Sequence, residues 1–172
     1  ASGDRTILRS FGRPEQGAMR LPLLLGGGVF LLLLGGYTLL SPWLDLSAIS
    51  GNLQAKEGFT AATFPLAALY ITFGNSLLEE LFFLGFAFLA LYRSGYKKLA
   101  WTFSAIAFAL YHVSIMDGWF HPALLVLLTS GLACAGLLFN ALDAKSQTIW
   151  PGWLVHIGAN LAINTIALHL WG

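Results

Sequence analysis

Two adjacent carboxylates, Glu79 and Glu80, interrupt a long apolar stretch of the sequence. At the centre of a membrane-spanning helix, one ionised carboxylate costs about 2.5 to 3.5 kcal/mol, so the pair would cost about 5 to 7 kcal/mol. Pairing, protonation or contact with water usually reduces such a cost, and charges in this position often mark functional sites. Because successive residues of a helix point about 100° apart, the two carboxylates cannot share one partner equally well. We expect one to face the bundle interior and the other to meet a neighbouring helix.

Two histidines and an asparagine in other apolar stretches supply polar groups that could meet these carboxylates. His112 lies in one such stretch, and His156 lies in the last one of the chain. Asn160 follows His156 by one helical turn, so their side chains share a face, and Asn164 continues the same stripe. A single histidine in an apolar helix is more often a satisfied hydrogen-bonding group. Several polar groups on three helices favour one polar site.

These residue types suit the hydrolysis of a peptide bond. A shielded carboxylate can take a proton from water, and a histidine can assist that base or protonate the leaving amine. A histidine and an asparagine one turn apart can donate hydrogen bonds to a developing oxyanion. A zinc site of one glutamate and two histidines stays an alternative, although His-Glu-x-x-His is absent. A serine hydrolase is less favoured because Gly-x-Ser-x-Gly is absent.

The composition of the chain indicates that these groups lie in a membrane. Of the 172 residues, 57% are hydrophobic and 10% are charged, whereas about 25% of residues are charged in a typical soluble domain. So few charged residues cannot supply the polar surface of a soluble domain. This composition excludes a soluble enzyme and a disordered chain. The net charge of +1 argues against a nucleic-acid partner. Cys134 is the single cysteine, so no intrachain disulfide can form.

Five apolar stretches are long enough to cross a bilayer, which requires about 20 residues per helix. The sequence therefore predicts an all-α fold, a polytopic transmembrane helical bundle of about five spans. The second stretch is too long for one upright span. We expect its start, from Phe64 to Gly74, to be an interfacial segment with Pro65 in the first helical turn, and the span to begin near Tyr70. The stretches are Leu21–Leu40, Ala61–Tyr92, Leu99–Met116, Ala123–Leu142 and Ile149–Trp171.

Glycine clusters in the first stretch indicate a close helix–helix contact. They comprise residues 26–28 and residues 35–36, and small residues let another helix approach closely within a membrane. A dimer could use them, but packing within the chain is the favoured interpretation. The sequence makes no prediction of the oligomeric state.

The basic residues predict how the bundle is oriented. With five spans and a cytoplasmic N-terminus, only Lys56 of the nine Lys and Arg residues falls on the extracytoplasmic side, so the prediction is N-in and C-out. We divide the chain into a basic cytoplasmic segment, residues 1–20, and a single transmembrane catalytic domain, residues 21–172. The cytoplasmic residues would be Arg5, Arg9, Arg13, Arg20, Arg93, Lys97, Lys98 and Lys145.

Distances along the expected helices show whether the polar groups can meet. At about 1.5 Å per residue, Glu79 and His112 each lie about 20 Å from the cytoplasmic boundary. His156 lies about 11 Å from it and Asn160 about 17 Å. These depths agree within one or two helical turns. We therefore expect one buried site, at mid-membrane or in the extracytoplasmic half.

Three motifs in this order resemble those of the CAAX-protease and bacteriocin-processing (CPBP, or Abi) family of intramembrane proteases, which is related to the Rce1-type enzymes. Glu-Glu-x-x-x-Arg is matched at Glu79 and Glu80, with Leu84 in place of the arginine. Phe-x-x-x-His is matched from Phe108 to His112, and His-x-x-x-Asn from His156 to Asn160. The resemblance covers about half of the chain, residues 77–165.

This resemblance implies a role for each matched residue. Glu79 would be the general base that activates water, and His112 would be its catalytic partner. His156 and Asn160 would form the oxyanion hole, and Glu80 would be a supporting carboxylate. No cofactor is implied, and Leu84 removes a cation that could pair with Glu80. Short bacterial members are associated with C-terminal sorting tails of the JDVT-CTERM type, which implies a substrate that carries such a tail.

The sequence thus predicts a glutamic-type intramembrane endopeptidase in the bilayer of a bacterial or archaeal cell (inner) membrane. Its partners would be a protein or peptide substrate and the surrounding lipid. Two alternatives use the same polar cluster without proteolysis. One is a membrane scaffold or immunity-type protein that packs or binds a partner through it, and the other is an ion or proton carrier.

Overall fold

A computed structural model describes residues 6–116 and 120–170 of the chain. Arg5 and the expected end of the last span at Trp171 lie outside these ranges. Within them the secondary structure is helical and no strand occurs, which confirms the predicted all-α class. The elements are α1 (Thr6–Arg9), α2 (Arg20–Leu40), η1 (Ser41–Trp43), α3 (Leu46–Glu57), α4 (Phe64–Leu69), η2 (Tyr70–Asn75), α5 (Ser76–Glu79), η3 (Glu80–Ala90), α6 (Leu91–Arg93), α7 (Lys97–Met116), α8 (Pro122–Ser146) and α9 (Trp150–His169).

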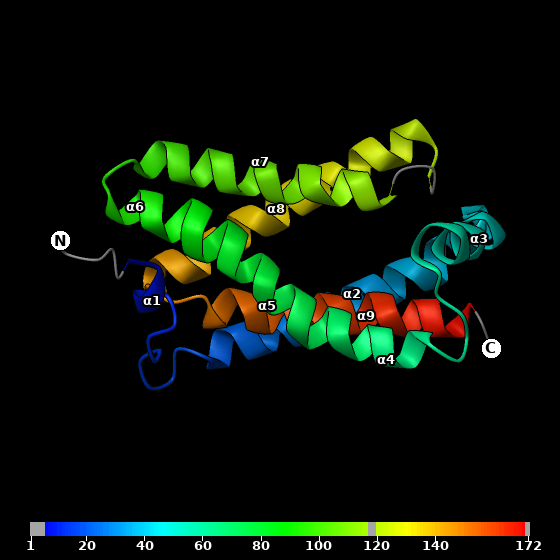
Figure 1. The fold of residues 1–172 in the computed structure, drawn as a ribbon, viewed down its shortest axis with the longest axis horizontal. Helices are drawn as coiled ribbons and strands as arrows, with labels where there is room; N and C mark the ends of the chain where they lie inside the picture. Colours follow the sequence, from blue (N-terminus) through cyan, green and yellow to red (C-terminus); the bar gives the residue numbers. More distant parts are fainter. Residues whose placement is uncertain (1–5, 117–119, 171–172) are drawn as a thin grey trace.

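The long helices of the described chain run back and forth along the molecule (Figure 1). Helix α2 leads away from the end that holds the N-terminus, and the continuous helix from α4 to α6 returns to it. Helices α7 and α8 make the next two passes, and α9 ends beside the C-terminus at the opposite end. Helix α5 lies about midway along this length. The course of the chain therefore matches the five predicted passes.

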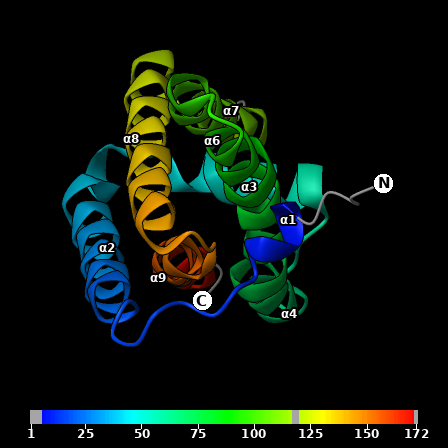
Figure 2. The same cartoon turned by 90° about the vertical axis from the view of Figure 1, so that its left-hand side faces the viewer.

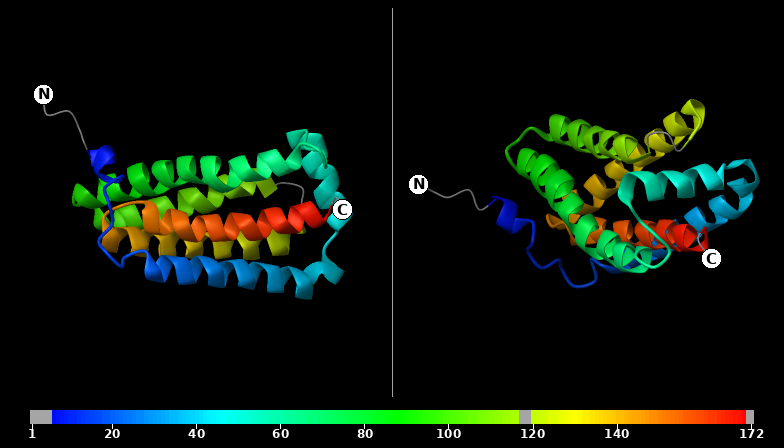
Figure 3. Two further views of the ribbon diagram at one scale, coloured as in Figure 1. Left: turned by 90° about the horizontal axis from the view of Figure 1, so that it is seen from below. Right: turned by 45° about the vertical axis from the view of Figure 1, so that its right-hand side comes forward.

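Four of these helices have the length and apolar composition needed to cross a membrane, namely Arg20–Leu40, Phe64–Arg93, Lys97–Met116 and Pro122–Ser146. Helix α9 is the fifth expected span but falls outside this group, since its Trp, His and Asn residues lower its apolar character. It contacts α2, α8 and the α4–α6 helix, and views along and from below the bundle show it among them (Figures 2 and 3). Neighbouring helices therefore shield two of its polar residues, His156 and Asn164, which are buried.

The second predicted stretch forms one helix of 30 residues, from Phe64 to Arg93. Pro65 lies in its first turn, as predicted. The helix continues through Tyr70 without a break, so the expected interfacial start belongs to the same helix as the span. At about 1.5 Å per residue it is longer than the hydrocarbon core of about 30 Å, and it runs obliquely to α9 (Figure 1).

Two segments of this helix, η2 and η3, are wound as π-helix on either side of α5. Such winding is rare and is often found at functional sites. No residue pattern in the sequence predicted it. The short helix α3 was also missed, because its polar residues give it no apolar face that sequence periodicity could reveal.

The basic residues of the described chain gather at the end of the bundle that holds α1. Arg93 closes α6, Lys97 opens α7 and Lys145 lies in the last turn of α8. Lys56 lies in the last turn of α3, at the opposite end (Figure 1). This separation agrees with the predicted N-in orientation. Which end faces the cytoplasm stays a prediction.

The apolar core lies between η3, α7, α8 and α9. It contains Phe83, Leu84, Phe88, Leu89, Ala100, Phe108, Phe139, Ile149 and Val155. Leu84, which replaces the arginine of the resembled motif, is fully buried in this cluster. The core therefore holds the helix of Glu79 and Glu80 against the helices that carry the two histidines.

Helices α2 and α9 touch at the backbone through two glycines. A Cβ atom built on Gly158 would lie 2.3 Å from the Gly26 carbonyl oxygen, and one on Gly26 would lie 3.0 Å from the Leu154 carbonyl oxygen. The predicted packing of the glycine cluster within the chain is thus confirmed for Gly26. A Cβ on Gly27 would meet nothing within 4 Å.

Replacing Gly158 with alanine is expected to destabilise the fold by about 1 to 3 kcal/mol, the usual cost of overpacking. The new methyl group would meet backbone rather than a movable side chain, so α2 and α9 must separate. Thermal unfolding of the purified protein in detergent measures the effect as a lower Tm. Gly27→Ala is the matched control, and an equal Tm for the two variants would contradict the proposed contact.

Candidate active site

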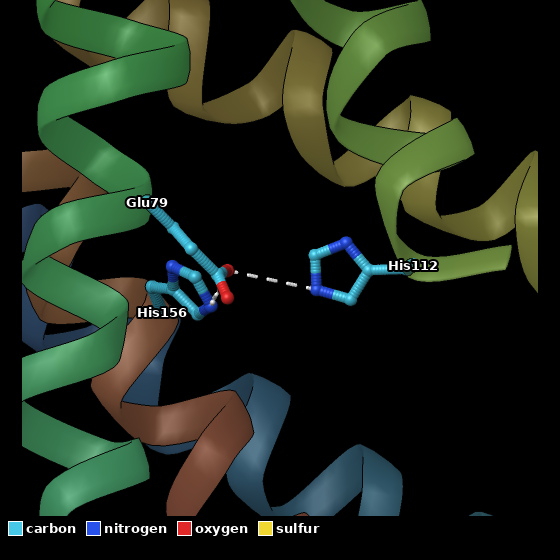
Figure 4. Close-up of side chains that lie close together, drawn as sticks. All are labelled: Glu79, His112 and His156. Atoms are coloured by element: carbon cyan, nitrogen blue, oxygen red, sulfur yellow. Dashed lines mark ion pairs between the residues drawn. The ribbon is translucent and has the colours of Figure 1, made fainter. Parts of the chain in front are cut away.

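Three helices bring one carboxylate and two imidazoles together midway along the bundle. The Oε2 atom of Glu79, on α5, lies 3.7 Å from Nε2 of His112 on α7 and 3.6 Å from Nε2 of His156 on α9. Figure 4 shows Glu79 and His156 side by side, with the ring of His112 pointing at the carboxylate from across the gap. The structure thus brings together three of the predicted site residues, at one carboxylate oxygen.

The backbone of α7 sets the orientation of the His112 ring. Nδ1 of His112 lies 2.8 Å from the Phe108 carbonyl oxygen, and a carbonyl can only accept, so Nδ1 carries a proton and donates. In a neutral ring, the Nε2 atom that faces Glu79 then has a free lone pair. The side chain is 20% exposed. His112 is therefore the most open member of the cluster.

Two further side chains hold Glu79, and sequence reasoning missed both. The amide of Asn75 donates a hydrogen bond to Oε1 of Glu79, and the side chain of Tyr111 also hydrogen-bonds the carboxylate. Asn75 precedes Glu79 by one helical turn, a spacing that could have identified it. Tyr111 could have been suspected only as the neighbour of His112. Because Asn75 binds Oε1, Oε2 is the oxygen that faces the two histidines.

His156 contacts both carboxylates through different ring nitrogens. Nδ1 lies 3.0 Å from Oε1 of Glu80, and Nε2 faces Glu79. We expected that the two glutamates cannot share one partner equally well, because their side chains diverge on a helix. The two contacts are indeed unequal, at 3.0 Å for Glu80 and 3.6 Å for Glu79, and they use the two ring nitrogens, which point in different directions. Glu80 is fully buried and supports His156 directly.

Aromatic rings fix the plane of His156. Phe139 stacks on it with a centroid distance of 5.6 Å and an interplanar angle of 24°. Phe108 meets it edge-on at 5.7 Å. The imidazole is 4% exposed, so its rotation is restricted by packing as well as by its contacts with the two carboxylates.

Asn160 lies one turn beyond His156 on α9, as predicted. In the part of the chain that the structure describes, its hydrogen bond is to another residue than Glu79. Its amide donates to the Ile71 carbonyl oxygen at 3.3 Å. Asn164 donates to Thr72 Oγ1 at 2.9 Å and to the Ala68 carbonyl oxygen at 3.1 Å. The asparagine stripe thus connects α9 to the first half of the helix that carries Glu79.

Sequence reasoning also missed Asp143, because the expected fourth span ended at Leu142. Helix α8 continues to Ser146, and Asp143 is fully buried within it. Its Oδ1 atom accepts a hydrogen bond of 3.0 Å from the Gly152 amide, in the first turn of α9. The structure therefore adds a third buried carboxyl group to Glu79 and Glu80, one residue beyond the expected end of the fourth span.

The same three side chains are close enough to bind a metal ion. One ligand atom from each of Glu79, His112 and His156 lies within 4.8 Å of the others. A glutamate and two histidines can form a three-ligand catalytic zinc site with an open fourth position. The geometry is therefore compatible with either water activation by Glu79 or a bound zinc ion.

Comparisons with known proteins assign the chain to a family. Neither the curated proteins nor the solved structures include a significant match. The family model described as type II CAAX prenyl endopeptidase Rce1-like matches residues 61–162, which is more than half of the chain. These residues include Glu79, His112, His156 and Asn160. The chain is therefore a membrane protein of the Rce1-like family of type II CAAX prenyl endopeptidases.

Proposed function

We propose that this protein is a glutamic-type intramembrane endopeptidase. The family is a protease family, and the observation that carries the finer proposal is the position of Glu79. Its Oε2 atom faces one nitrogen from each of two histidines, at 3.6 and 3.7 Å, inside an apolar bundle. A carboxylate and two imidazoles at one point are the groups that general acid–base hydrolysis requires.

In the proposed reaction, Glu79 and His112 orient one water molecule. The Glu79 carboxylate and the free Nε2 lone pair of His112 both accept hydrogen bonds, so a water can donate to both. As the water oxygen attacks the peptide carbonyl carbon, Glu79 takes its proton and the carbonyl becomes an oxyanion. Collapse of this intermediate breaks the C–N bond, and the proton passes to the leaving amine. The products are a new carboxylate and a new amine, with no covalent enzyme intermediate.

His156 and Asn160 would stabilise the oxyanion. They share one face of α9, and His156 already directs Nε2 towards the oxygen of Glu79 that would bind water. Asn160 would exchange its hydrogen bond to Ile71 for one to the substrate. His156, whose ring is fixed by Phe108 and Phe139, would contribute through this fixed geometry, since no reorganisation of its N–H is needed as the charge develops.

The substrate would be a membrane-associated protein that is cleaved near its C-terminus. A bundle whose apolar helices surround the site favours a substrate that reaches it from the bilayer. Two probes represent the two kinds of tail, a farnesylated peptide with a C-terminal CaaX sequence and a peptide with an apolar C-terminal sorting tail. We expect the protein in liposomes to cleave at least one of them, detected by mass spectrometry. Cleavage of neither would contradict the proposal.

The zinc alternative predicts a different response to metal removal. In the proposed mechanism, a chelator followed by dialysis leaves the cleavage rate unchanged, because Glu79 itself activates the water. Elemental analysis of the purified active protein then finds zinc well below one ion per chain. If the chelator abolishes cleavage and zinc restores it, the metal-dependent mechanism replaces the proposed one.

A further inference from the structure

Asp143 is a buried acidic residue that the proposed mechanism does not use. Its side chain is fully buried, and Oδ1 accepts a hydrogen bond from the Gly152 amide. Its other oxygen, Oδ2, has no hydrogen-bond partner in the described part of the chain. The same holds for Oε2 of Glu80, whose Oε1 contacts His156. Two buried carboxyl groups thus each have one unsatisfied oxygen.

Gly152 shows that these two oxygens border the same space. A Cβ atom built on Gly152 would lie 2.9 Å from Oε2 of Glu80 and 3.2 Å from Oδ2 of Asp143. Asp143 and Glu80 also interact electrostatically. Only glycine leaves room for both carboxyl groups against α9. Gly152 precedes His156 by one helical turn, so this space lies directly beside the imidazole along the same face.

Within residues 6–116 and 120–170, no Lys or Arg side chain compensates the two carboxyl groups. Neither of them forms an ion pair with a Lys or Arg among the described residues, and the position of the family's arginine is occupied by Leu84 in the apolar core. Buried polar atoms are rarely left without partners. A hydrogen bond between Asp143 and Glu80 would satisfy both oxygens, and it requires a proton on one of the two groups.

The contacts of His156 determine the direction of that hydrogen bond. If Glu79 is the ionised base, the Nε2 atom of His156 that faces it must carry a proton. In a neutral ring, Nδ1 then accepts, so Glu80 donates through Oε1. The Oε2 atom of Glu80 is then the carbonyl oxygen and can only accept. Asp143 is left as the donor, since its Oδ1 already accepts from Gly152.

We propose that Asp143 is a positioning residue of the hydrolytic site: it donates a hydrogen bond to Glu80, which donates to His156 and so keeps the proton on Nε2. This assignment rests on the proposed function, because the fixed tautomer supplies the oxyanion donor. It also accounts for the loss of the family's arginine at Leu84. The carboxyl group of Asp143 takes the place of a cation as the partner of Glu80.

The test determines directly which ring nitrogen of His156 carries the proton. The full-length protein is labelled with ¹⁵N-histidine and studied by NMR in lipid nanodiscs. It has four histidines, and His156→Gln assigns the signal. We expect a protonated Nε2 and a hydrogen-bonded, unprotonated Nδ1 in the unmodified protein. A protonated Nδ1 with an unprotonated Nε2 would overturn the proposal, and this result needs no variant that might fail to fold.

Variants of Asp143 then test its role as a donor. Asp143→Asn keeps an acceptor for Gly152 and an N–H donor for Glu80, so it is expected to retain the tautomer and the kcat. Asp143→Ala removes the donor. It is expected to move the His156 proton partly to Nδ1 and to lower kcat about 10- to 100-fold with little change in KM, as for other partners that orient a histidine. An unchanged tautomer and kcat in Asp143→Ala would overturn the proposal.

Asn140 provides a matched control on the same helix. It is also fully buried, but its amide contacts are with Trp101 and Ser104, away from His156. Asn140→Ala is expected to lower the Tm and leave the His156 signals in place. A shift of the tautomer in both variants would instead indicate general loosening of the bundle and overturn the specific role of Asp143. The NMR result does not depend on activity, so it tests the role of Asp143 by itself. Failure of the proposed function would be recognised separately, by cleavage that does not require Glu79.

Discussion

Replacing Glu79 with glutamine is expected to lower the cleavage rate by about 10²- to 10⁴-fold, the usual contribution of a general base. Glutamine keeps the size of the side chain and an oxygen that accepts from Asn75, but it cannot take a proton from water. The rate is measured with the protein in liposomes, using whichever tail peptide the unmodified protein cleaves. The thermal unfolding and membrane insertion of the variant should match those of the unmodified protein.

The matched control for this change is Glu15→Gln. Glu15 is exposed and lies far from the site in sequence. Its replacement by glutamine removes a carboxylate in the same way as Glu79→Gln. Its cleavage rate should be unchanged. Full activity in purified Glu79→Gln protein would exclude Glu79 as the base, and the cluster would then have to serve packing, partner binding or proton movement instead.

Replacing His112 with alanine is the second change expected to have a large effect, a decrease in kcat of about 10²- to 10⁴-fold. His112 donates to the Phe108 carbonyl and so presents a free lone pair towards Glu79. Without it, the attacking water loses one of its two acceptors. Because His112 acts on the water and not on the substrate tail, KM should change little. Steady-state kinetics on the same peptide separate the two constants.

His169→Ala is the control for this variant, since His169 is exposed in the last turn of α9. The control should retain the full kcat. A His112→Ala protein whose kcat stays within a factor of two of the unmodified value would remove His112 from the mechanism. A large rise in KM at constant kcat would assign it to substrate binding.

Much of the site was predictable because the membrane makes charge rare. Within the predicted spans, only Glu79 and Glu80 carried a formal charge, so they identified the polar centre of an apolar bundle. The spacing from His156 to Asn160 then predicted a shared helical face. Depth along the helices predicted that Glu79 and His112 could meet, and the structure places them 3.7 Å apart.

The parts that could not be predicted depend on contacts between helices. Hydropathy predicts that the fourth span ends at Leu142, so Asp143 was expected in a loop. Hydropathy does not indicate which other helices pack against the turn that follows Leu142. The bridging position of His156 required the relative rotation of α9 and the helix of Glu80, which periodicity does not fix. The π-helical winding of η2 and η3 could not be predicted either, because no pattern of residue types in the sequence indicates it.

The central claim is that Glu79 activates a water molecule that attacks the peptide bond directly. Cleavage of the tail peptide in ¹⁸O-water, limited to a single turnover, tests it most directly. The proposed mechanism predicts one ¹⁸O atom in the new carboxylate of the product and none in the enzyme peptide that contains Glu79. Appearance of ¹⁸O in that enzyme peptide would contradict the mechanism, because it would show that the Glu79 carboxylate itself had formed a covalent bond to the substrate.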